Sequence, residues 1–280
     1  MYVQNSSQIS DDISVNAGIR ADFLSYFSPN FNPRLALIIN PTENSALKYL
    51  FNVGYRTPSI YELFADDESF KVVNVGLKPE RLVSNELLFE NRVNSTLIYT
   101  LSLFYNSFSQ IIELSSVYPE NADSLYVYKN IDGYRVYGAE VSLIAKPDDR
   151  IYFYTNCTYQ KSRDSSGHNM TNSPELMLKA GFSYKLSKSI FFSFEGRYES
   201  GRDVSYNLRT EPHFLLDFNV GISPEFSGKG YLSFMNNLFL GLRVKNLLDK
   251  SYFMPGPNWV STQFTEQYGR ILSFIIRAKV

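Results

Sequence analysis

The fold is decided by residues 176–222, which include LMLKAGFSYKL (176–186), IFFSFEGRYE (190–199) and FLLDFNVGI (214–222). In each stretch, apolar or aromatic residues recur at every second position, and most of the positions between them are polar, charged or glycine. Side chains alternate across a β-strand, so this spacing gives each stretch one apolar face and one polar face. The three stretches are therefore predicted to be three successive β-strands.

The same two-residue period continues through the chain and predicts twelve strands in total. In eight of them the apolar face carries no Asp, Glu, Lys or Arg, although 20% of all residues are charged. Most predicted strands have nine to thirteen residues; soluble strands have about five to six, and a tilted strand across a bilayer has ~9–11. The predicted strands are 12–23, 32–40, 46–56, 82–92, 96–108, 134–146, 150–162, 175–186, 189–200, 213–223, 237–247 and 269–280.

The connections between the predicted strands alternate in length, with exceptions at 24–31 and 224–236. Transmembrane barrels combine tight turns on the periplasmic side with long outer loops, so the alternation favours such a barrel. Counting from an inner-side start at Asp12, the long connections fall outside and Val280 ends on the periplasmic side. The short connections are 41–45, 93–95, 147–149 and 187–188, and the long ones are 57–81, 109–133, 163–174, 201–212 and 248–268.

Composition excludes several classes of protein. The 27 Lys and Arg balance 28 Asp and Glu, so the net charge of −1 gives no reason to expect nucleic acid as a partner. A mean hydropathy of −0.21, with no apolar run near ~20 residues, argues against a membrane-spanning helix. One cysteine excludes an internal disulfide, and two histidines make a His-rich metal site improbable. Residues 1–12 are polar and contain no visible signal peptide.

No phosphate-binding glycine loop, zinc-ligand spacing or nucleophile elbow occurs, so we expect neither an enzyme nor a cofactor. The enzyme rival is a twelve-stranded outer-membrane phospholipase, which would need a nucleophile oriented by histidine. Neither His168 nor His213 has a serine at a suitable spacing. A soluble β-sandwich would also alternate apolar and polar faces. Strand length, loop alternation and aromatic residues near the strand ends favour the all-β, antiparallel transmembrane β-barrel.

Five segments of the chain stand out as motifs: YRTPSIYEL (55–63), GLKPE (76–80), Asn130–Gly133 followed by YGAE (137–140), VKNLLDKSY (244–252) and Gly269-Arg270. In this order they resemble motifs of the TonB-dependent outer-membrane receptor family. Thr57 stands where that family usually has Ala, Glu86-Leu87-Leu88 lacks a frequent Gly, and Val280 replaces the usual terminal aromatic residue.

The resemblance implies that residues 1–280 are the C-terminal part of an outer-membrane β-barrel, with about 12 of a probable 22 strands. No plug domain, energy-coupling segment or second domain is visible in the sequence. The implied function is TonB-dependent uptake, in the bacterial outer membrane, of a scarce nutrient such as a ferric siderophore, cobalamin or a glycan. The implied partners are TonB, acting through a plug domain, the lipid and lipopolysaccharide of that membrane, and the nutrient itself, such as a metal chelate.

Two groups of functional residues are predicted. Aromatic and basic residues in the long loops suit a bulky, often anionic chelate, because aromatic faces and guanidinium groups attract such ligands. A mixed-charge face is expected to line the lumen, although a passive twelve-stranded channel would need the same polar wall. The candidate ligand contacts are Tyr61, Arg202, Tyr206, Arg209, Trp259 and Tyr268, and the lumen-facing residues are Arg56, Glu86, Glu90, Arg92, Glu140, Glu195, Arg197, Asp217 and Arg243.

The motif residues also have local structural explanations. Pro58 fixes its own φ and keeps Thr57 extended, so the strand is expected to stop before it. Asn246 and Asp249 are turn formers that can hydrogen-bond the nearby backbone where a strand ends. We therefore expect turn and rim structure, rather than ligand contact, to be the main role of these motifs.

Overall fold

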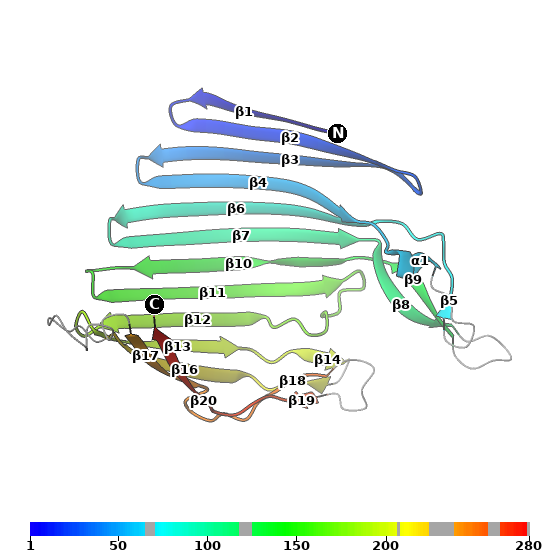
Figure 1. Cartoon of the computed structure of the whole chain (residues 1–280). Coiled ribbons are helices and arrows are strands. Elements are labelled where there is room, and N and C mark those ends of the chain that lie inside the picture. The colour runs from blue at the N-terminus through cyan, green and yellow to red at the C-terminus, as the bar shows by residue number, and fades with distance from the viewer. Residues whose placement is uncertain (65–70, 118–124, 206–207, 224–237, 257–263, 279–280) are drawn as a thin grey trace. The chain divides into compact units, whose positions relative to one another are not determined.

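The computed structural model describes residues 1–64, 71–117, 125–205, 208–223, 238–256 and 264–278 (Figure 1). Thirteen of the described strands form one sheet in the order β1-β2-β3-β4-β6-β7-β10-β11-β12-β13-β16-β17-β20. The order follows the chain, so each strand pairs with the next long strand in sequence. The bounds are β1 Tyr2–Ser10, β2 Ile13–Leu24, β3 Phe27–Thr42, β4 Ser45–Arg56, β6 Glu80–Asn94, β7 Leu97–Ser109, β10 Tyr134–Ala145, β11 Ile151–Asp164, β12 Leu176–Lys185, β13 Ile190–Glu199, β16 His213–Ile222, β17 Leu238–Lys245 and β20 Ile271–Ala278.

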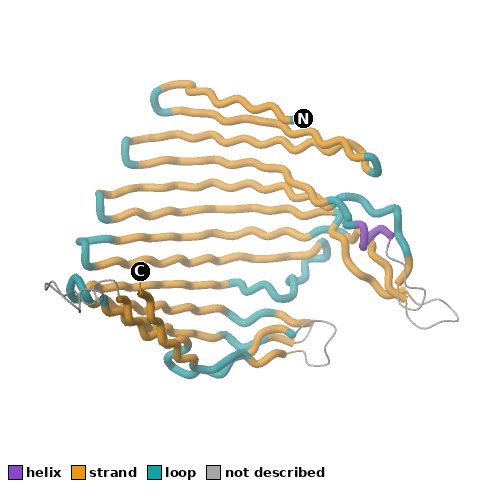
Figure 2. Tube along the Cα trace, in the orientation of Figure 1, coloured by secondary structure: helices purple, strands orange, loops and turns teal. Residues whose placement is uncertain are grey.

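The long connections contain short elements of their own, which Figure 2 shows as orange strands and one purple helix. Their brevity explains why periodicity did not reveal them. Within the described residues, no helix is both long and apolar enough to cross a membrane. The short elements are α1 Ile60–Phe64, β5 Lys71–Val72, β8 Ile111–Val117, β9 Leu125–Ile131, β14 Asp203–Ser205, β15 Leu208–Arg209, β18 Phe253–Pro255 and β19 Phe264–Glu266.

The chain divides into two compact units, which are described separately. Unit 1 consists of Met1–Phe89, Ser102–Gly138 and Lys161–Met170. Unit 2 consists of Glu90–Leu101, Ala139–Gln160 and Thr171–Val280.

The strand register places the apolar residues of each unit on one face. In unit 1, Val15 of β2 is opposite Leu37 of β3, which is opposite Tyr49 of β4. In unit 2 the pairing runs from Phe182 through Phe194 to Phe218 and Val244, on β12, β13, β16 and β17. Apolar rows that meet across strands are the pattern that alternation within each strand predicts.

Most of this apolar face remains uncovered. Phe31 on β3 of unit 1 is 51% exposed, and Phe274 on β20 of unit 2 is 81% exposed. Among the described residues, the buried apolar side chains are only Leu63, Leu77, Val127, Leu215 and Val244. A β-sandwich would bury its apolar face against a second sheet, so the described structure contradicts the soluble-sandwich alternative.

The sheet has thirteen strands, one more than the twelve counted from the sequence, because the polar segment before Asp12 forms β1. It pairs with β2, and Val3 is opposite Ile19 while Asn5 and Ser7 are opposite Ala17 and Val15. Asn5 and Ser7 therefore occupy the otherwise apolar face of β1. They interrupt the two-residue apolar period by which the other strands were predicted. They bond each other, since the Asn5 Nδ2 atom donates to Ser7 Oγ at 2.9 Å.

This extra strand also moves the chain start away from the predicted inner side. Met1 lies at the opposite end of β1 from Asp12, where the backbone nitrogen of Ala21 donates to the Met1 carbonyl at 2.8 Å.

The connection predicted at 24–31 is also wrong. β2 continues to Leu24, which is opposite Phe27 at the start of β3. Pro33 lies inside β3, opposite Ile19, and interrupts the pattern expected of a strand. The turn at this end of β2 and β3 is therefore tight, where the predicted alternation called for a longer loop.

Candidate functional site at the long-loop ends of the strands

One candidate site lies in unit 1, where β4 ends and α1 begins. β4 stops at Arg56, two residues before Pro58, as predicted. The backbone nitrogen of Ser59 then donates to Glu62 Oε2 at 2.6 Å, and the Glu62 nitrogen donates to Ser59 Oγ at 3.2 Å. This reciprocal pair is a capping box. The Ser-x-x-Glu spacing could have predicted the helix, which periodicity missed.

Arg56 lies between two carboxylates and bonds both in a bidentate manner. Its Nη1 and Nη2 atoms donate to Glu62 at 3.0 and 3.1 Å. Its Nε and Nη2 atoms donate to Glu80 at 2.6 and 2.8 Å. Glu80 also accepts the backbone nitrogen of Ile112 at 2.8 Å. One guanidinium therefore joins the end of β4, α1, the start of β6 and β8.

The cluster sets one positive charge between two negative charges. The side chains of Glu62 and Glu80 are 14% and 18% exposed, whereas that of Arg56 is 48% exposed. Burial raises the pKa of Glu62, but hydrogen bonds from Arg56 and Ser59 and the charge of Arg56 outweigh burial and hold that pKa below its usual value. Because both carboxylates already neutralise Arg56, the cluster is suited to bracing loops rather than to binding an anion.

A second contact in unit 1 joins two of the motifs. Asn130 Oδ1 accepts the backbone nitrogen of Lys78 at 2.7 Å, and its Nδ2 atom donates to the carbonyls of Lys78 and Gln110 at 2.8 and 2.7 Å. Gly133 passes so close to Phe108 that a Cβ would lie 1.5 Å from the Phe108 carbonyl oxygen. These residues fix loop positions, in line with the rim role expected of the motifs.

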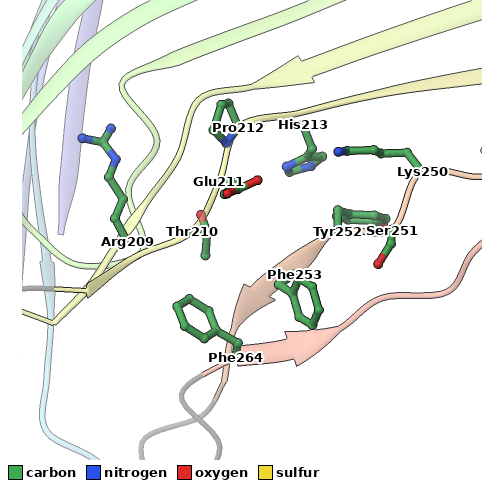
Figure 3. A pocket seen from close by; sticks show the side chains of 10 residues that line it. All are labelled: Arg209, Thr210, Glu211, Pro212, His213, Lys250, Ser251, Tyr252, Phe253 and Phe264. Atoms are coloured by element: carbon green, nitrogen blue, oxygen red, sulfur yellow. The ribbon is translucent and has the colours of Figure 1, made fainter.

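A separate candidate site, within unit 2, is a cavity of about 420 Å³ (Figure 3). One side comes from the segment that leads into β16, and the other from the segment after β17 with the β18–β19 hairpin. The residues that line it are Arg209, Thr210, Glu211, Pro212, His213, Lys250, Ser251, Tyr252, Phe253 and Phe264.

The segment after β17 is held by Asn246 and Asp249, both of which have positive φ, at 50° and 53°. Asn246 Oδ1 accepts the backbone nitrogen of Lys250 at 2.9 Å, and its Nδ2 atom donates to the Lys250 carbonyl at 2.9 Å. Asp249 Oδ1 accepts the backbone nitrogen of Arg270 at 2.8 Å. The prediction that these two residues form turns at a strand exit is confirmed.

Aromatic rings form much of the cavity wall. His213 is 7% exposed, and its ring stacks on Tyr252 with centroids 4.6 Å apart and planes at 23°. Phe253 and Phe264 meet edge to face at 6.5 Å across the hairpin. Figure 3 shows the Lys250 side chain pointing toward His213. The cavity thus combines aromatic surface with one flexible ammonium group.

The structure brings one of the predicted ligand contacts to this cavity. Arg209 lines it, and its Nη2 atom donates to the Gly201 carbonyl at 2.8 Å. Arg202 in unit 2 bonds Asn172 at 3.0 Å and pairs with Glu199.

The other predicted contacts lie elsewhere or are not described. Tyr61 is 61% exposed on α1 of unit 1, with its ring 6.3 Å from that of Tyr128. Tyr268 is 85% exposed and does not line the cavity. Tyr206 and Trp259 lie outside the described residues.

Sequence reasoning did not select His213, Lys250, Tyr252 or Phe264 as site residues. His213 was considered only as a partner for a nucleophile, and Lys250 and Tyr252 only as parts of a motif. A histidine directly after Glu-Pro at the start of a strand was the available signal, but nothing in the sequence placed it beside Lys250.

Four predicted lumen-facing residues form one network in unit 2. Glu195 accepts the Tyr154 hydroxyl at 2.5 Å and pairs with Lys179 at 3.3 Å and Arg197 at 3.9 Å. Asp217, 2% exposed, pairs with Arg197 at 3.1 Å and Arg243 at 4.0 Å. It also accepts the backbone nitrogen of Asn246 at 2.9 Å, so the network reaches the segment that carries Lys250.

The remaining residues of that prediction are dispersed. Arg56 belongs to the brace in unit 1, and Glu86 in the same unit accepts the Ser102 hydroxyl at 2.6 Å. Glu140 in unit 2 accepts the Thr158 hydroxyl at 3.3 Å. In unit 2, Glu90 is half-buried and Arg92 is exposed. Whether these side chains face a lumen stays a prediction. In the described part of the chain, no group of three or more His, Cys, Asp or Glu side chains is placed to hold a metal ion.

Comparison with known proteins places this geometry among outer-membrane receptors. The family model described as TonB dependent receptor-like, beta-barrel matches residues 1–247. The ferrienterobactin receptor of Escherichia coli K12 is 23% identical over 235 residues, which cover 76% of this chain and 31% of that protein. An iron-regulated outer membrane virulence protein of Vibrio cholerae serotype O1 is 24% identical over 190 residues, or 63% of this chain and 29% of that protein.

Solved structures give the same result for the fold. A mutant of the ferric enterobactin receptor of Pseudomonas aeruginosa matches with a TM-score of 0.81 and 20% identity, over 99% of this chain and 44% of that one. A siderophore receptor of Acinetobacter baumannii matches with a TM-score of 0.78 and 17% identity, over 97% and 44%. At these identities the likeness shows the fold. The chain spans about a third of the length of the curated relatives.

Proposed function

Because this chain belongs to the TonB-dependent receptor β-barrel family of the bacterial outer membrane, we propose that it forms barrel wall and outer loops of a receptor for TonB-dependent nutrient uptake. The family is one of receptors rather than enzymes. The observation that carries the proposal is the sheet itself, in which long strands leave one apolar face uncovered and place ion pairs on the other. Such a sheet suits a wall between hydrocarbon and a water-filled interior.

We propose an iron chelate, of the siderophore type, as the nutrient. Support comes from the names of the relatives, which are an iron-regulated outer membrane protein and receptors for ferrienterobactin and siderophores. Cobalamin and glycans remain the other classes that the sequence resemblance implied. In this proposal the cavity of unit 2 and the loops on the Arg56 brace belong to the outer vestibule.

The proposed interior surface is the network of Glu195, Arg197, Asp217 and Arg243. Its partner would be the plug domain through which TonB acts, and the partners of the apolar face would be lipid and lipopolysaccharide. An ion-pair network is a suitable lining because its partly exposed members, Glu195, Arg197 and Arg243, present both signs of charge.

Iron-limited growth tests this function. The full-length gene is placed in a strain that lacks its own siderophore receptors, and growth is measured with ferric siderophores as the iron source, with and without a working TonB. We expect growth that depends on both the gene and TonB. Growth without TonB would indicate a passive channel, and growth on cobalamin or a glycan alone would replace the proposed nutrient.

A further inference from the structure

The ion-pair network on the polar face of unit 2 converges on one buried carboxylate. Asp217 Oδ2 on β16 lies 3.1 Å from Arg197 Nη2 on β13 and 4.0 Å from Arg243 Nη2 on β17. The other oxygen, Oδ1, accepts the backbone nitrogen of Asn246 at 2.9 Å. Asp217 therefore draws together two guanidinium groups from the strands on either side of it, while both of its oxygens are already engaged.

The two arginines keep hydrogen-bond donors that the wall does not use. Arg197 donates to Asp217 from Nη2, but its Nε atom is 3.9 Å from Glu195, which is too far for a hydrogen bond. Arg243 approaches Asp217 only to 4.0 Å. The Nε atoms of both arginines are shielded from solvent and have no partner among the described residues. Buried polar atoms are nearly always bonded, so this pair of arginines calls for a further acceptor.

The charge of the network indicates that this acceptor is an anion. Three cations share two carboxylates, which leaves one positive charge in excess. Lys245 is exposed on the same face of β17 and adds to the positive charge there. Glu195 is occupied by the Tyr154 hydroxyl and by Lys179. The cations are Lys179, Arg197 and Arg243, and the carboxylates are Glu195 and Asp217.

Both arginines can be reached by a partner. Their side chains are 42% and 43% exposed, whereas the Asp217 that they share is 2% exposed. A carboxylate offers two oxygens and bonds guanidinium groups in a bidentate manner. Its single negative charge also equals the excess charge of the network. A second carboxylate at the exposed side of the arginines would therefore satisfy both their free donors and their charge.

We propose that Arg197 and Arg243 form a clamp for a carboxylate that comes from outside the described sheet. The occupant is the side chain of an Asp or Glu on a protein segment inside the barrel. A free carboxylic acid loses its translational freedom on binding, and partly exposed ion pairs contribute little, whereas a side chain on a folded segment is already held in place. The inference rests on the proposed function, which turns this face toward the interior, and it names the group that the wall holds there.

Carbodiimide coupling in the full-length receptor tests the clamp. The receptor carries Arg243→Lys, and the reagent joins an amine to a carboxylate that contacts it; isotope-labelled succinate is present as the probe for a free acid. Peptide mass spectrometry identifies the carboxylate that is joined to residue 243. We expect one product with Asp217, which lies beside this position, and a second product with an Asp or Glu outside the described sheet.

Two further variants locate the binding. Arg197→Gln, added to Arg243→Lys, should lower the second product at least about threefold, because the clamp loses one of its two charged donors. The product with Asp217 should persist and shows that the wall is folded. Arg277→Lys is the matched control, since Arg277 on β20 lies over the Phe239 ring at 5.5 Å. It should give at least about fivefold less coupling to carboxylates outside the sheet.

Coupling to Asp217 or Glu195 alone would overturn the clamp, as would equal coupling from Arg277→Lys. Coupling to succinate alone would overturn the protein segment as the occupant. If the receptor supports TonB-dependent growth but the second product never forms, this inference fails and the proposed function stands. If the second product forms but growth never depends on the gene, the proposed function fails and the clamp remains.

Discussion

The brace around Arg56 gives a prediction that can be worked out from its contacts. Replacing Arg56 by Gln removes four charged hydrogen bonds and leaves the largely buried Glu62 and Glu80 carboxylates facing each other. Charged hydrogen bonds contribute about 1.5–3 kcal/mol each when well shielded, and far less when exposed. Because the arginine side chain is 48% exposed, we expect a total local loss of about 2 kcal/mol.

Hydrogen exchange measures this loss directly, because two backbone amides bond to the same carboxylates. The Ser59 amide donates to Glu62 and the Ile112 amide donates to Glu80. A loss of about 2 kcal/mol corresponds to roughly thirtyfold faster exchange at both amides, at about 1.4 kcal/mol per factor of ten. Arg56→Lys should give an intermediate rate, since an ammonium cannot bond two carboxylates in a bidentate manner.

Arg81→Gln is the matched control, because Arg81 is an exposed neighbour on β6 that lines neither carboxylate. Its exchange rates at the two amides should equal those of the unchanged chain. The reasoning is refuted if Arg56→Gln leaves both amides protected, or if only one of them is affected, since the brace requires one guanidinium to hold both loops.

Three further predictions concern neighbouring features. Gly133→Ala should destabilise unit 1 by about 2 kcal/mol or more, because its Cβ would lie 1.5 Å from a carbonyl oxygen; thermal unfolding checks this against Gly54→Ala, where a Cβ meets nothing within 4 Å. The pKa of Glu62 is lowered in the folded chain, so the contribution of its ionised form to stability is present above the unfolded pKa of about 4.3 and is lost as the pH falls through the folded pKa. Protease cleavage of the α1 loop should therefore rise below about pH 4. Cleavage that does not rise would contradict the ion pairs of Glu62. Asp217→Ala removes the acceptor of the Asn246 amide, and exchange at that amide should accelerate at least about tenfold; unchanged exchange would show that the bond adds nothing.

The alternation of apolar and polar residues predicted the bounds of a strand accurately wherever one of its faces is uniformly apolar and the other polar. The predicted segment 189–200 is the strand Ile190–Glu199, and 213–223 is His213–Ile222. In the structure, the apolar residues of neighbouring strands lie opposite one another, as Phe194 lies opposite Phe218, and such pairing restricts the register. The prediction failed where a face is mixed, as at Asn5 and Ser7, or where a proline interrupts a strand, as at Pro33.

The candidate site was less predictable, for a physical reason. The long loops have no period, so their arrangement depends on single contacts between segments far apart in sequence. Two such contacts are the hydrogen bond from the Lys78 backbone nitrogen to Asn130 and the stacking of His213 on Tyr252. Arg209 was predicted only from its residue type and its position in a long loop. The sequence did not predict which residues would lie beside it.

The hydrogen bond between Asn5 and Ser7 has a consequence for how this segment can change over generations. Under the proposed function the pair lies on the face of the sheet that contacts lipid hydrocarbon. There the hydrogen bond between the two side chains reduces the cost of placing each polar group out of water. Replacing one of the two residues leaves the polar side chain of the other without its hydrogen-bond partner. Replacing both by apolar residues leaves a fully apolar surface. Sequences that evolve from this chain are therefore expected to retain both polar residues or to replace both. Sequences that retain only one of them should be rare.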